Sequence, residues 1–465
     1  MTPGPSAPLS VVDIDLAEPG VFRRPGGAAR NGPSGRALGL VRLHGRPLGT
    51  AEASGGGPDE LWRALAAAAR REFPAAGEEA GADFGPGPGL VPGSALETDP
   101  GPGPCRGPGA EAGPGSGEAP GPGSVPGSGE VPVVSVIVAT RDRAGMLRDC
   151  LDSLRALRYP CFEVIVVDNA PADAATEELV RREYGGGRPE VRYLREPVPG
   201  LARAHNRGLA GARGRIAAFT DDDTLVDPEW LTALAAPFAA DPATGCVTGL
   251  IVPAELETEA QLALERHGAF AKGYAPRTWS LRDPPPDPLF PFTAGRFGSG
   301  ANMAFRTDLL RELGGFDPAT GVGTPAHGGD DLLAFFRVIA RGRALSYAPD
   351  AIVWHRHRRT ADALAAQAFG YGAGLGAYLT SALVHEPRML PAFLRRLPGG
   401  ARYALTRGRA RTGPAAGPST GPGAGRGAVP PGLARRELRG LLFGPVGYAR
   451  SRYDEHRLRH RTGAR

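Results

Sequence analysis

Residues 133–139 read VVSVIVA, a continuous run of β-branched and small apolar residues. Such a run is typical of a strand that is buried on both faces of a parallel sheet. A segment with helical spacing of its apolar residues follows at 143–157, and EVIVV at 163–167 predicts a second buried strand. The alternation continues with a helix, a strand, a helix and a strand at 173–184, 191–195, 201–212 and 215–219. These intervals predict a doubly wound α/β fold with a mostly parallel sheet, flanking helices and right-handed crossovers.

The composition divides the chain into four parts. Of its 465 residues, 69 are Gly and 48 are Pro, and 26 of these fall among the 45 residues of 85–129. A tract this rich in Gly and Pro buries too little apolar surface to order itself, so we interpret it as a linker. We expect a small accessory module at 1–80, the linker at 81–131, the α/β domain at 132–387 and an Arg-rich tail at 388–465.

The accessory module shows strand-like runs at 11–16 and 37–48, the second interrupted by a turn at His44-Gly45. Residues 59–73 then have the pattern of a helix, so the module is predicted to be α+β. Its residues suggest no chemistry.

Charge is distributed unevenly along the chain. Residues 388–465 contain 17 Arg and three acidic residues, which gives this segment a net charge of +14. Because the whole chain has a net charge of +5, the first 387 residues have a net charge of −9. A uniformly basic nucleic-acid-binding protein has a different distribution, and we expect no nucleic-acid partner. Two interpretations of the tail remain open: contact with an anionic membrane surface, or solvated disorder in a chain with biased codon use. A short helical piece is predicted at 433–442.

The longest uncharged run, 363–385, is mostly Ala and Gly, with small-xxx-small pairs at Gly370/Gly374 and Gly372/Gly376. We expect a helix packed on the domain rather than a membrane span. The hydrophobic fraction of 41% likewise argues against a polytopic membrane protein. No signal peptide is recognised at the start, and the four cysteines lack metal-binding spacing and are interpreted as reduced thiols. The sequence therefore predicts a cytoplasmic protein, with the inner face of the membrane as an alternative place of action.

Polar side chains follow three of the predicted strands. Thr140 and Asp142 follow the first, Asp168 follows the second, and Asp221 and Asp223 follow the strand at 215–219. Each carboxylate alone is explained by helix capping or turn formation. Together they are more informative, because ligands of doubly wound sheets bind beyond the carboxyl ends of the strands. Two carboxylates at the spacing D-x-D are hard oxygen ligands suited to Mg²⁺ or Mn²⁺.

Five segments in this order resemble family-2 glycosyltransferases of the GT-A fold over roughly residues 131–360. They are PVVSVIVATRDRAGMLRDCLDSL, EVIVVDNA, PGLARAHNRGLAGARGRIAAFTDDDTLVDPEWL, FGSGANMAFRTDLLRELGGFD and GGDDLLAFFRVIARG followed by ALSYAPDAIVWH. The resemblance implies transfer of a sugar from a nucleotide-sugar donor to an acceptor hydroxyl, with inversion at the anomeric carbon and with a divalent metal, Mg²⁺ or Mn²⁺, as cofactor.

The resemblance also implies roles for the residues at the strand ends. Thr140 and Asp142 lie on the loop that holds the nucleotide, and Asp168 binds its base. Asp221 and Asp223 match the D-x-D metal motif, Asp221 also contacting the donor. His355 matches a histidine that completes the metal shell in many members, with a structural histidine as the alternative reading.

The pair Asp330-Asp331 matches the acidic pair of the family, in which the second carboxylate is the general base. Asp331 is therefore the candidate base, and Asp330 is assigned to the acceptor side. Asp at the first position, rather than Glu, resembles rhamnosyl- and galactofuranosyl-type members. The alternative is that both acids simply favour a helix N-terminus. His357 is a weaker competitor for the role given to His355.

The Q-x-x-R-W motif of processive synthases is missing after Asp331 and no transmembrane bundle is recognised, so single-sugar transfer is predicted. The resemblance implies a role in cell-envelope or glycoconjugate biosynthesis. The acceptor is unknown; a lipid-linked acceptor is the candidate that would make membrane contact by the tail useful. Two other functions remain open. One is a nucleotidyltransferase, although TRDRAGM after the first strand lacks the Gly-rich basic signature expected of it. The other is a non-catalytic nucleotide-sugar-binding scaffold.

Overall fold

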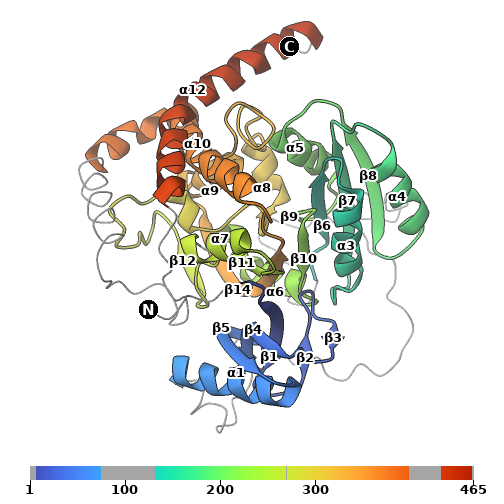
Figure 1. Cartoon of the computed structure of the whole chain (residues 1–465). Coiled ribbons are helices and arrows are strands. Elements are labelled where there is room, and N and C mark those ends of the chain that lie inside the picture. The colour runs from blue at the N-terminus through green and yellow to red at the C-terminus, as the bar shows by residue number, and fades with distance from the viewer. Residues whose placement is uncertain (1–6, 75–130, 269, 397–430, 463–465) are drawn as a thin grey trace, which may run out of the picture.

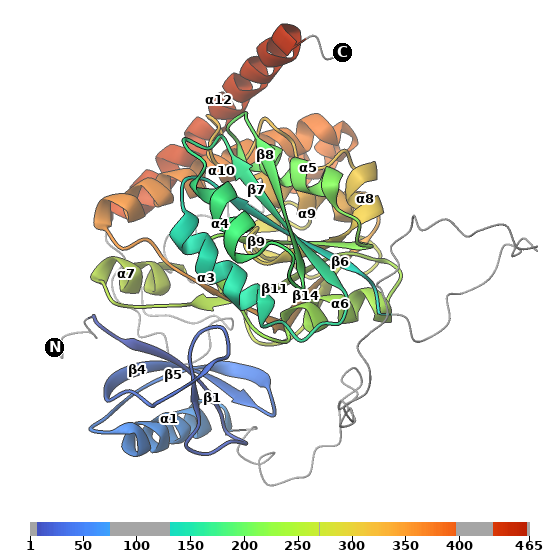
Figure 2. The same ribbon diagram turned by 90° about the vertical axis from the view of Figure 1, so that its right-hand side faces the viewer.

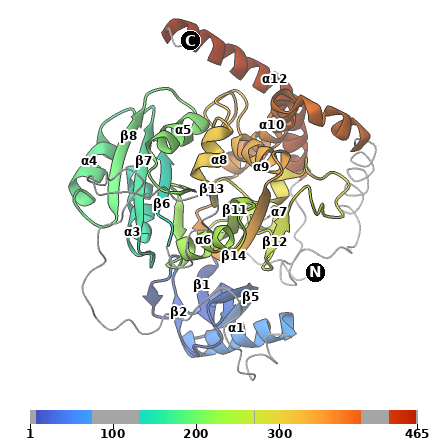
Figure 3. The same cartoon turned by 180° about the vertical axis from the view of Figure 1, so that it is seen from behind.

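The computed structural model describes residues 7–74, 131–268, 270–396 and 431–462 (Figure 1). The predicted linker and residues 397–430 of the predicted tail lie almost entirely outside these ranges. Within them the chain forms a large α/β domain, with a small module at one end and a long C-terminal helix at the other (Figures 1 and 3).

A nine-stranded sheet forms the centre of the α/β domain. Its strand order is β10-β14-β11-β13-β9-β6-β7-β8, with β12 paired to β14. The strands are β6 (Val134–Thr140), β7 (Phe162–Asn169), β8 (Glu190–Glu196), β9 (Ile216–Asp221), β10 (Thr224–Val226), β11 (Thr244–Pro253), β12 (Arg277–Trp279), β13 (Met303–Arg306) and β14 (Ala344–His355). The run β9-β6-β7-β8 is parallel, as is the pair β11-β14, whereas β13 is antiparallel to both of its neighbours.

Helices cover both faces of this sheet. They are α3 (Ala144–Arg155), α4 (Ala175–Glu183), α5 (Leu201–Gly211), α6 (Trp230–Ala240), α7 (Glu259–Gly268), α8 (Thr307–Glu312), α9 (Asp330–Ala340), α10 (Ala361–His385) and α12 (Pro431–Thr462), with short 3₁₀ turns at Ala294–Arg296 and Pro387–Met389. Alternate residues of β6 belong to different cores: Val136 packs with α3 and α6, and Ile137 packs with α5 and α9. This alternation confirms the predicted doubly wound arrangement, in which both faces of the strand are buried.

The N-terminal module is a five-stranded sheet backed by one helix, and Figure 2 shows it as a separate layer against the α/β domain. The strand order is β3-β2-β1-β4-β5. The elements are β1 (Ser10–Asp15), β2 (Phe22–Arg23), β3 (Ala29–Arg30), β4 (Gly35–Leu43), β5 (Arg46–Gly55) and α1 (Pro58–Glu72). His44 and Gly45 form the predicted turn between β4 and β5, both with positive φ.

The other face of this small sheet is buried against the α/β domain. Val11 and Leu40 pack with Leu250 and Trp354, from β11 and β14. The buried Arg42 also pairs with Asp13 of its own sheet at 2.8 Å and with Asp227 of the α/β domain at 2.5 Å. The sequence did not indicate this docking, because it depends on residues nearly two hundred positions apart.

Helix α10 confirms the expectation of a helix packed on the domain, since its glycine-rich face lies against α12. In the described part of the chain, none of the helices combines the length and the apolar character that crossing a membrane requires. Helix α12 is much longer than the predicted 433–442. The prediction of four reduced cysteines is wrong for Cys161, which is disulfide-bonded, whereas Cys150 and Cys246 are free and buried.

Candidate functional site

The register of the sheet brings the predicted strand-end residues together. Thr140 at the end of β6 is paired with Asp168 of β7, and the preceding Ala139 is paired with Asp221 of β9. Strand β14 reaches the same region from the other side, because its last residue, His355, is paired with Thr224 of β10. Residues from four strands therefore meet at one edge of the sheet.

Asp221, Asp223 and His355 form a group that could hold a metal ion. One potential ligand atom from each lies within 4.8 Å of the others. The His355 Nε2 atom is 3.4 Å from Asp223 Oδ1, and this buried oxygen has no hydrogen-bond partner among the described residues. A buried carboxylate oxygen without a partner is costly, and a cation would remove that cost. The residues present fit a divalent metal.

Electrostatics at this group also fit a cation. Burial, followed by the charges of Asp223 and Asp222, raises the pKa of Asp221 well above its ordinary value. Burial lowers the pKa of His355 to about 4, so its imidazole is neutral at physiological pH and keeps a lone pair for a metal. A bound cation would offset the repulsion among the carboxylates.

Asp222, between the two predicted ligands, has a different role that the sequence did not reveal. Its Oδ2 accepts a 2.7 Å hydrogen bond from the Thr140 hydroxyl, and its Oδ1 accepts one of 3.0 Å from Arg143. The same Arg143 nitrogen lies 3.3 Å from Asp223 Oδ2. Thr140, predicted to bind the donor, therefore uses its hydroxyl within the protein, where it ties β6 to the loop after β9.

Asp142 and Asp168 lie beside each other at the ends of β6 and β7. Asp168 is fully buried, and its Oδ2 accepts a hydrogen bond from the Tyr193 hydroxyl at 3.1 Å. Its Oδ1 is buried with no hydrogen-bond partner in the described ranges, and burial raises the pKa of this carboxyl. Asp142 has a positive φ of 55° and accepts a hydrogen bond from the backbone N–H of Ala172. Asp168 thus retains one free acceptor.

Asp330 and Asp331 begin α9, after Gly329 in the left-handed conformation. The Oδ2 atom of Asp331 accepts a 2.8 Å hydrogen bond from the backbone N–H of Gly300, in the GSGAN segment. Burial, together with the charge of Asp330, raises the pKa of Asp331 to about 6. The carboxylate is therefore ionised at neutral pH, yet more basic than an ordinary aspartate.

Asp330 is buried beside a histidine that the sequence reading did not single out. The Nδ1 atom of His205, on α5, lies 3.5 Å from Asp330 Oδ2, and this oxygen has no hydrogen-bond partner within the described residues. Phe219 and Phe316 pack against the His205 ring with centroid distances of 5.1 and 5.0 Å. The signal available in the sequence was the position of His205, which is the fifth residue of the helix that begins after Gly200.

Comparison with known proteins assigns the domain. Residues 135–314 match the family model described as Glycosyl transferase family 2. The chain contains a glycosyltransferase family 2 domain. The resemblance drawn from the sequence motifs is thereby confirmed. The match includes Thr140, Asp168, Asp221 and Asp223, whereas Asp331 lies beyond its end.

Curated relatives of the chain include proteins that are named as glycosyltransferases. The Pre-mycofactocin glycosyltransferase of Mycobacterium tuberculosis is 30% identical over 270 residues, which cover 58% of this chain and 51% of the relative. The Glucosyl-dolichyl phosphate glucuronosyltransferase of Haloferax volcanii is 24% identical over 196 residues, which cover 40% and 57%. The aligned part of the chain thus spans about half the length of these relatives.

Solved structures similar to the chain include a mannosyltransferase from Pyrobaculum calidifontis in complex with GDP-Man and Mn²⁺. It is 22% identical, with a TM-score of 0.42, and the match covers 68% of this chain and 87% of that one.

Further side chains surround the carboxylates of the family 2 domain. The Phe270 ring packs against the rings of His355 and of Tyr371 on α10, with centroid distances of 5.0 Å and 6.2 Å. Two residues after Phe270 stands Lys272, the single lysine among 54 basic residues of the chain. Burial lowers the pKa of Lys272, and the charge of Asp331 opposes that shift. Phe270 thus connects His355 with α10, and the charges of Asp331 and Asp221 act on Tyr371 as well.

Proposed function

We propose that this protein transfers a single sugar from a nucleotide-sugar donor to an acceptor hydroxyl, with inversion and with a divalent metal. The observation that carries the proposal is the convergence of two chemically different acidic groups at one end of the sheet. Asp221 and Asp223, with His355, suit a cation, while Asp331 is raised in basicity and suits a proton acceptor. The family 2 match supports glycosyl transfer as the reaction class.

Asp221, Asp223 and His355 would hold the metal, either Mg²⁺ or Mn²⁺. When bound, the metal supplies positive charge that stabilises the departing nucleoside diphosphate. Arg143 keeps Asp222 and Asp223 in position from the other side. Asp168 would accept a hydrogen bond from the nucleotide base through its free Oδ1, and Asp142 is close enough for its charge to act on Asp168.

Asp331 would act as the general base. As the acceptor oxygen forms its bond to the anomeric carbon and the bond from that carbon to the diphosphate breaks, the hydroxyl proton passes to the Asp331 carboxylate. The backbone N–H groups of Gly300 and Leu332 donate to Oδ2 and Oδ1 of Asp331 and hold the carboxylate in place. Asp330, next to His205, would orient the acceptor.

For the acceptor we propose a lipid-linked molecule, with the Arg-rich C-terminal region in contact with the cytoplasmic face of the membrane. The guanidinium groups of α12 support the contact with anionic lipids.

Screening a panel of nucleotide sugars, with Mn²⁺ and with EDTA, tests the reaction. We expect metal-dependent release of a nucleoside diphosphate with one donor. Mass spectrometry of the product should show one added sugar, and proton NMR should show the inverted anomeric configuration. Release of pyrophosphate from a nucleoside triphosphate would instead identify a nucleotidyltransferase. Tight binding of a nucleotide sugar without turnover, in the presence of acceptor extracts, would identify a scaffold.

A further inference from the structure

Helix α12 is fixed to the domain by one face. A Cβ atom added to Gly444 would meet the backbone nitrogen of Ala377 at 2.5 Å, and one added to Gly440 would collide with the carbonyl oxygen of Phe369. Glycines at a four-residue spacing thus let the backbones of α10 and α12 touch. The Tyr448 hydroxyl also donates to Asp317 at 2.9 Å. The opposite face of α12 is therefore held in one orientation.

That opposite face carries an apolar stripe with basic edges. Four exposed apolar side chains of α12 lie on the same side of the helix: Leu438, Leu442, Val446 and Tyr453. Leu442 is 72% exposed. The exposed arginines beside them include Arg435, Arg439, Arg450 and Arg457. An apolar stripe bordered by long cationic side chains is the pattern of a helix that lies in a membrane interface.

We propose that this face of α12, the Leu438–Tyr453 stripe with its flanking arginines, docks on an anionic lipid bilayer. The inference rests on the proposed function, because a lipid-linked acceptor would reach the protein from this bilayer. A second copy of the chain fits the face poorly, because a two-fold contact would set arginine against arginine. Anionic headgroups complement the arginines, while the apolar side chains enter the region of the acyl chains.

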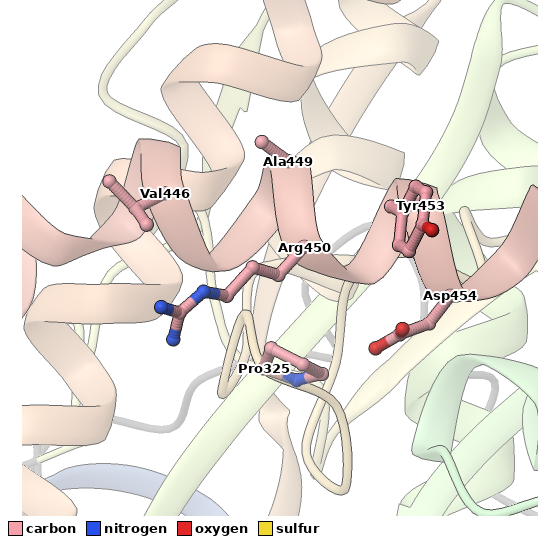
Figure 4. A pocket seen from close by; sticks show the side chains of 6 residues that line it. All are labelled: Pro325, Val446, Ala449, Arg450, Tyr453 and Asp454. Atoms are coloured by element: carbon pink, nitrogen blue, oxygen red, sulfur yellow. The ribbon is translucent and has the colours of Figure 1, made fainter.

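A single loop connects this face with the candidate acceptor carboxylates. Backbone pairing of Gly321 with Gly328 closes the loop. A Cβ at Gly321 would lie 3.3 Å from Asp330 Cγ, so the base of the loop touches the site. The carbonyl of Pro325 packs on Gly447 of α12, and Figure 4 shows Pro325 beneath the helix between Arg450 and Asp454. A membrane-bound acceptor would therefore reach Asp330 and Asp331 past this loop.

Vesicle flotation tests the docking face. The full chain is mixed with vesicles of equal amounts of phosphatidylglycerol and phosphatidylcholine, and with vesicles of phosphatidylcholine alone. We expect binding only to the first kind, and weaker binding as salt is raised. Leu442→Asp should weaken binding at least tenfold. Neutralising Arg435, Arg439 and Arg450 to Gln should weaken it by about 100-fold, because each charge near an anionic surface contributes about fivefold to the affinity.

Matched controls lie on α1, where Arg63, Arg70 and Arg71 are also exposed. Changing these three to Gln should leave vesicle binding unchanged. Equal loss in the α1 variant, or unchanged binding in the α12 variants, overturns the proposal. A wild-type dimer in light scattering that Leu442→Asp converts to a monomer also overturns it, by identifying a contact between copies. Hydrolysis of the donor is measured in parallel. If the wild-type protein binds the vesicles but hydrolyses no donor, that result counts against the proposed function and not against the docking face.

A second inference comes from a chain of three side chains behind the candidate metal group. His355 Nδ1 lies 3.1 Å from His357 Nδ1, and His357 Nε2 lies 3.1 Å from Oε2 of Glu265 on α7. The His357 side chain is buried, so its partners within the protein determine its proton positions. His357 is thus not a competitor of His355 for the metal; the two act in series.

The positions of the protons follow from the acceptor at the end of the chain. With the Glu265 carboxylate as the acceptor, the hydrogen bond places the proton on His357 Nε2 and leaves a lone pair at His357 Nδ1. That lone pair requires a proton on His355 Nδ1, which leaves the lone pair of His355 on Nε2. This is the nitrogen that faces Asp223 Oδ1.

We infer that Glu265 and His357 are positioning residues, which select the tautomer of His355 that can bind the metal. The inference rests on the proposed metal site. Partners of this kind behind a metal-binding histidine orient its ring and raise its basicity. A chain of two histidines extends the effect from α7 to the end of β14.

Binding of Mn²⁺ alone, measured by electron paramagnetic resonance of the free ion, tests this inference. His357→Ala and Glu265→Ala should each weaken Mn²⁺ binding by about 10–100-fold. Glu259→Ala, on the same helix but hydrogen-bonded to Ala7, is the matched control and should bind as the wild type does.

Nitrogen NMR of the metal-free protein with labelled histidines gives a second readout that needs no activity. His355 should carry its proton on Nδ1 in the wild type and lose this preference in the Glu265 variant. A proton on His355 Nε2 in the wild type, or unchanged Mn²⁺ affinity in both variants, overturns the inference. Failure of the wild type to bind Mn²⁺ would instead overturn the metal site of the proposed function.

Discussion

The carboxylate end of the sheet and the α10–α12 contact are built from opposite kinds of residue. The first consists of charged side chains whose chemistry is evident from their type, such as Asp221, Asp223 and Asp331. The second consists of residues without side chains, such as Gly376 and Gly444, whose function is to let two backbones touch. A change at the first should abolish chemistry and spare the fold, whereas a change at the second should weaken the fold and spare the chemistry.

The metal group should give the largest effect. Asp223→Asn removes a charge and a ligand from a buried cluster, so transfer should fall to the background rate, as it should for the wild type in EDTA. The measurement is the initial rate of nucleoside diphosphate release with and without Mn²⁺. Circular dichroism should show an unchanged fold. Full activity in EDTA would contradict the assignment.

The candidate base should come next. Asp331→Asn keeps the shape of the side chain and removes the proton acceptor, so kcat should fall by about 10²–10⁴-fold with little change in donor affinity. Asp330→Asn serves as the neighbouring comparison and should act mainly on KM for the acceptor. If Asp330→Asn abolished turnover and Asp331→Asn did not, the two roles would be reversed.

The helix contact should respond in stability. Gly444→Leu inserts a side chain where two backbones meet, which should lower the free energy of unfolding by about 1–3 kcal/mol. Ala449→Leu, on the exposed face of the same helix, is the control and should change it by less than about 0.5 kcal/mol. Thermal and urea unfolding measure both. Equal stability of the two variants would show that α12 does not pack on α10.

The dependence on pH should give the smallest effect. The pKa of Asp331 is raised to about 6, and only the ionised form accepts a proton. The value of kcat/KM for the acceptor should therefore be constant above neutral pH and fall through about pH 6, by tenfold for each further unit of acid. A residual rate in Asp331→Asn that lacks this fall would support the assignment. An unchanged acid limb in that variant would assign the titration to another group.

Much of the carboxylate site could be predicted from sequence because its parts are local. The apolar runs that become β6, β7 and β9 place their carboxyl ends at one edge of a parallel sheet, and the residues just after them follow directly. The role of Asp222, which lies between Asp221 and Asp223, was harder to predict. Asp222 looks equivalent to them in the sequence, and only its hydrogen bonds with Thr140 and Arg143 show its separate role.

The sequence by itself determined the alternation of strands and helices over 133–219, the acidic residues at the strand ends and the family of the domain. These depend on local periodicity and on residue types within short segments. The tertiary structure alone decided the packing of the N-terminal module on β14, the contacts of His205 and His357, and the extension of α12 through Gly440 and Pro445. Glycine and proline weaken an isolated helix, but close packing of backbone on backbone and buried contacts between distant segments outweigh that local preference.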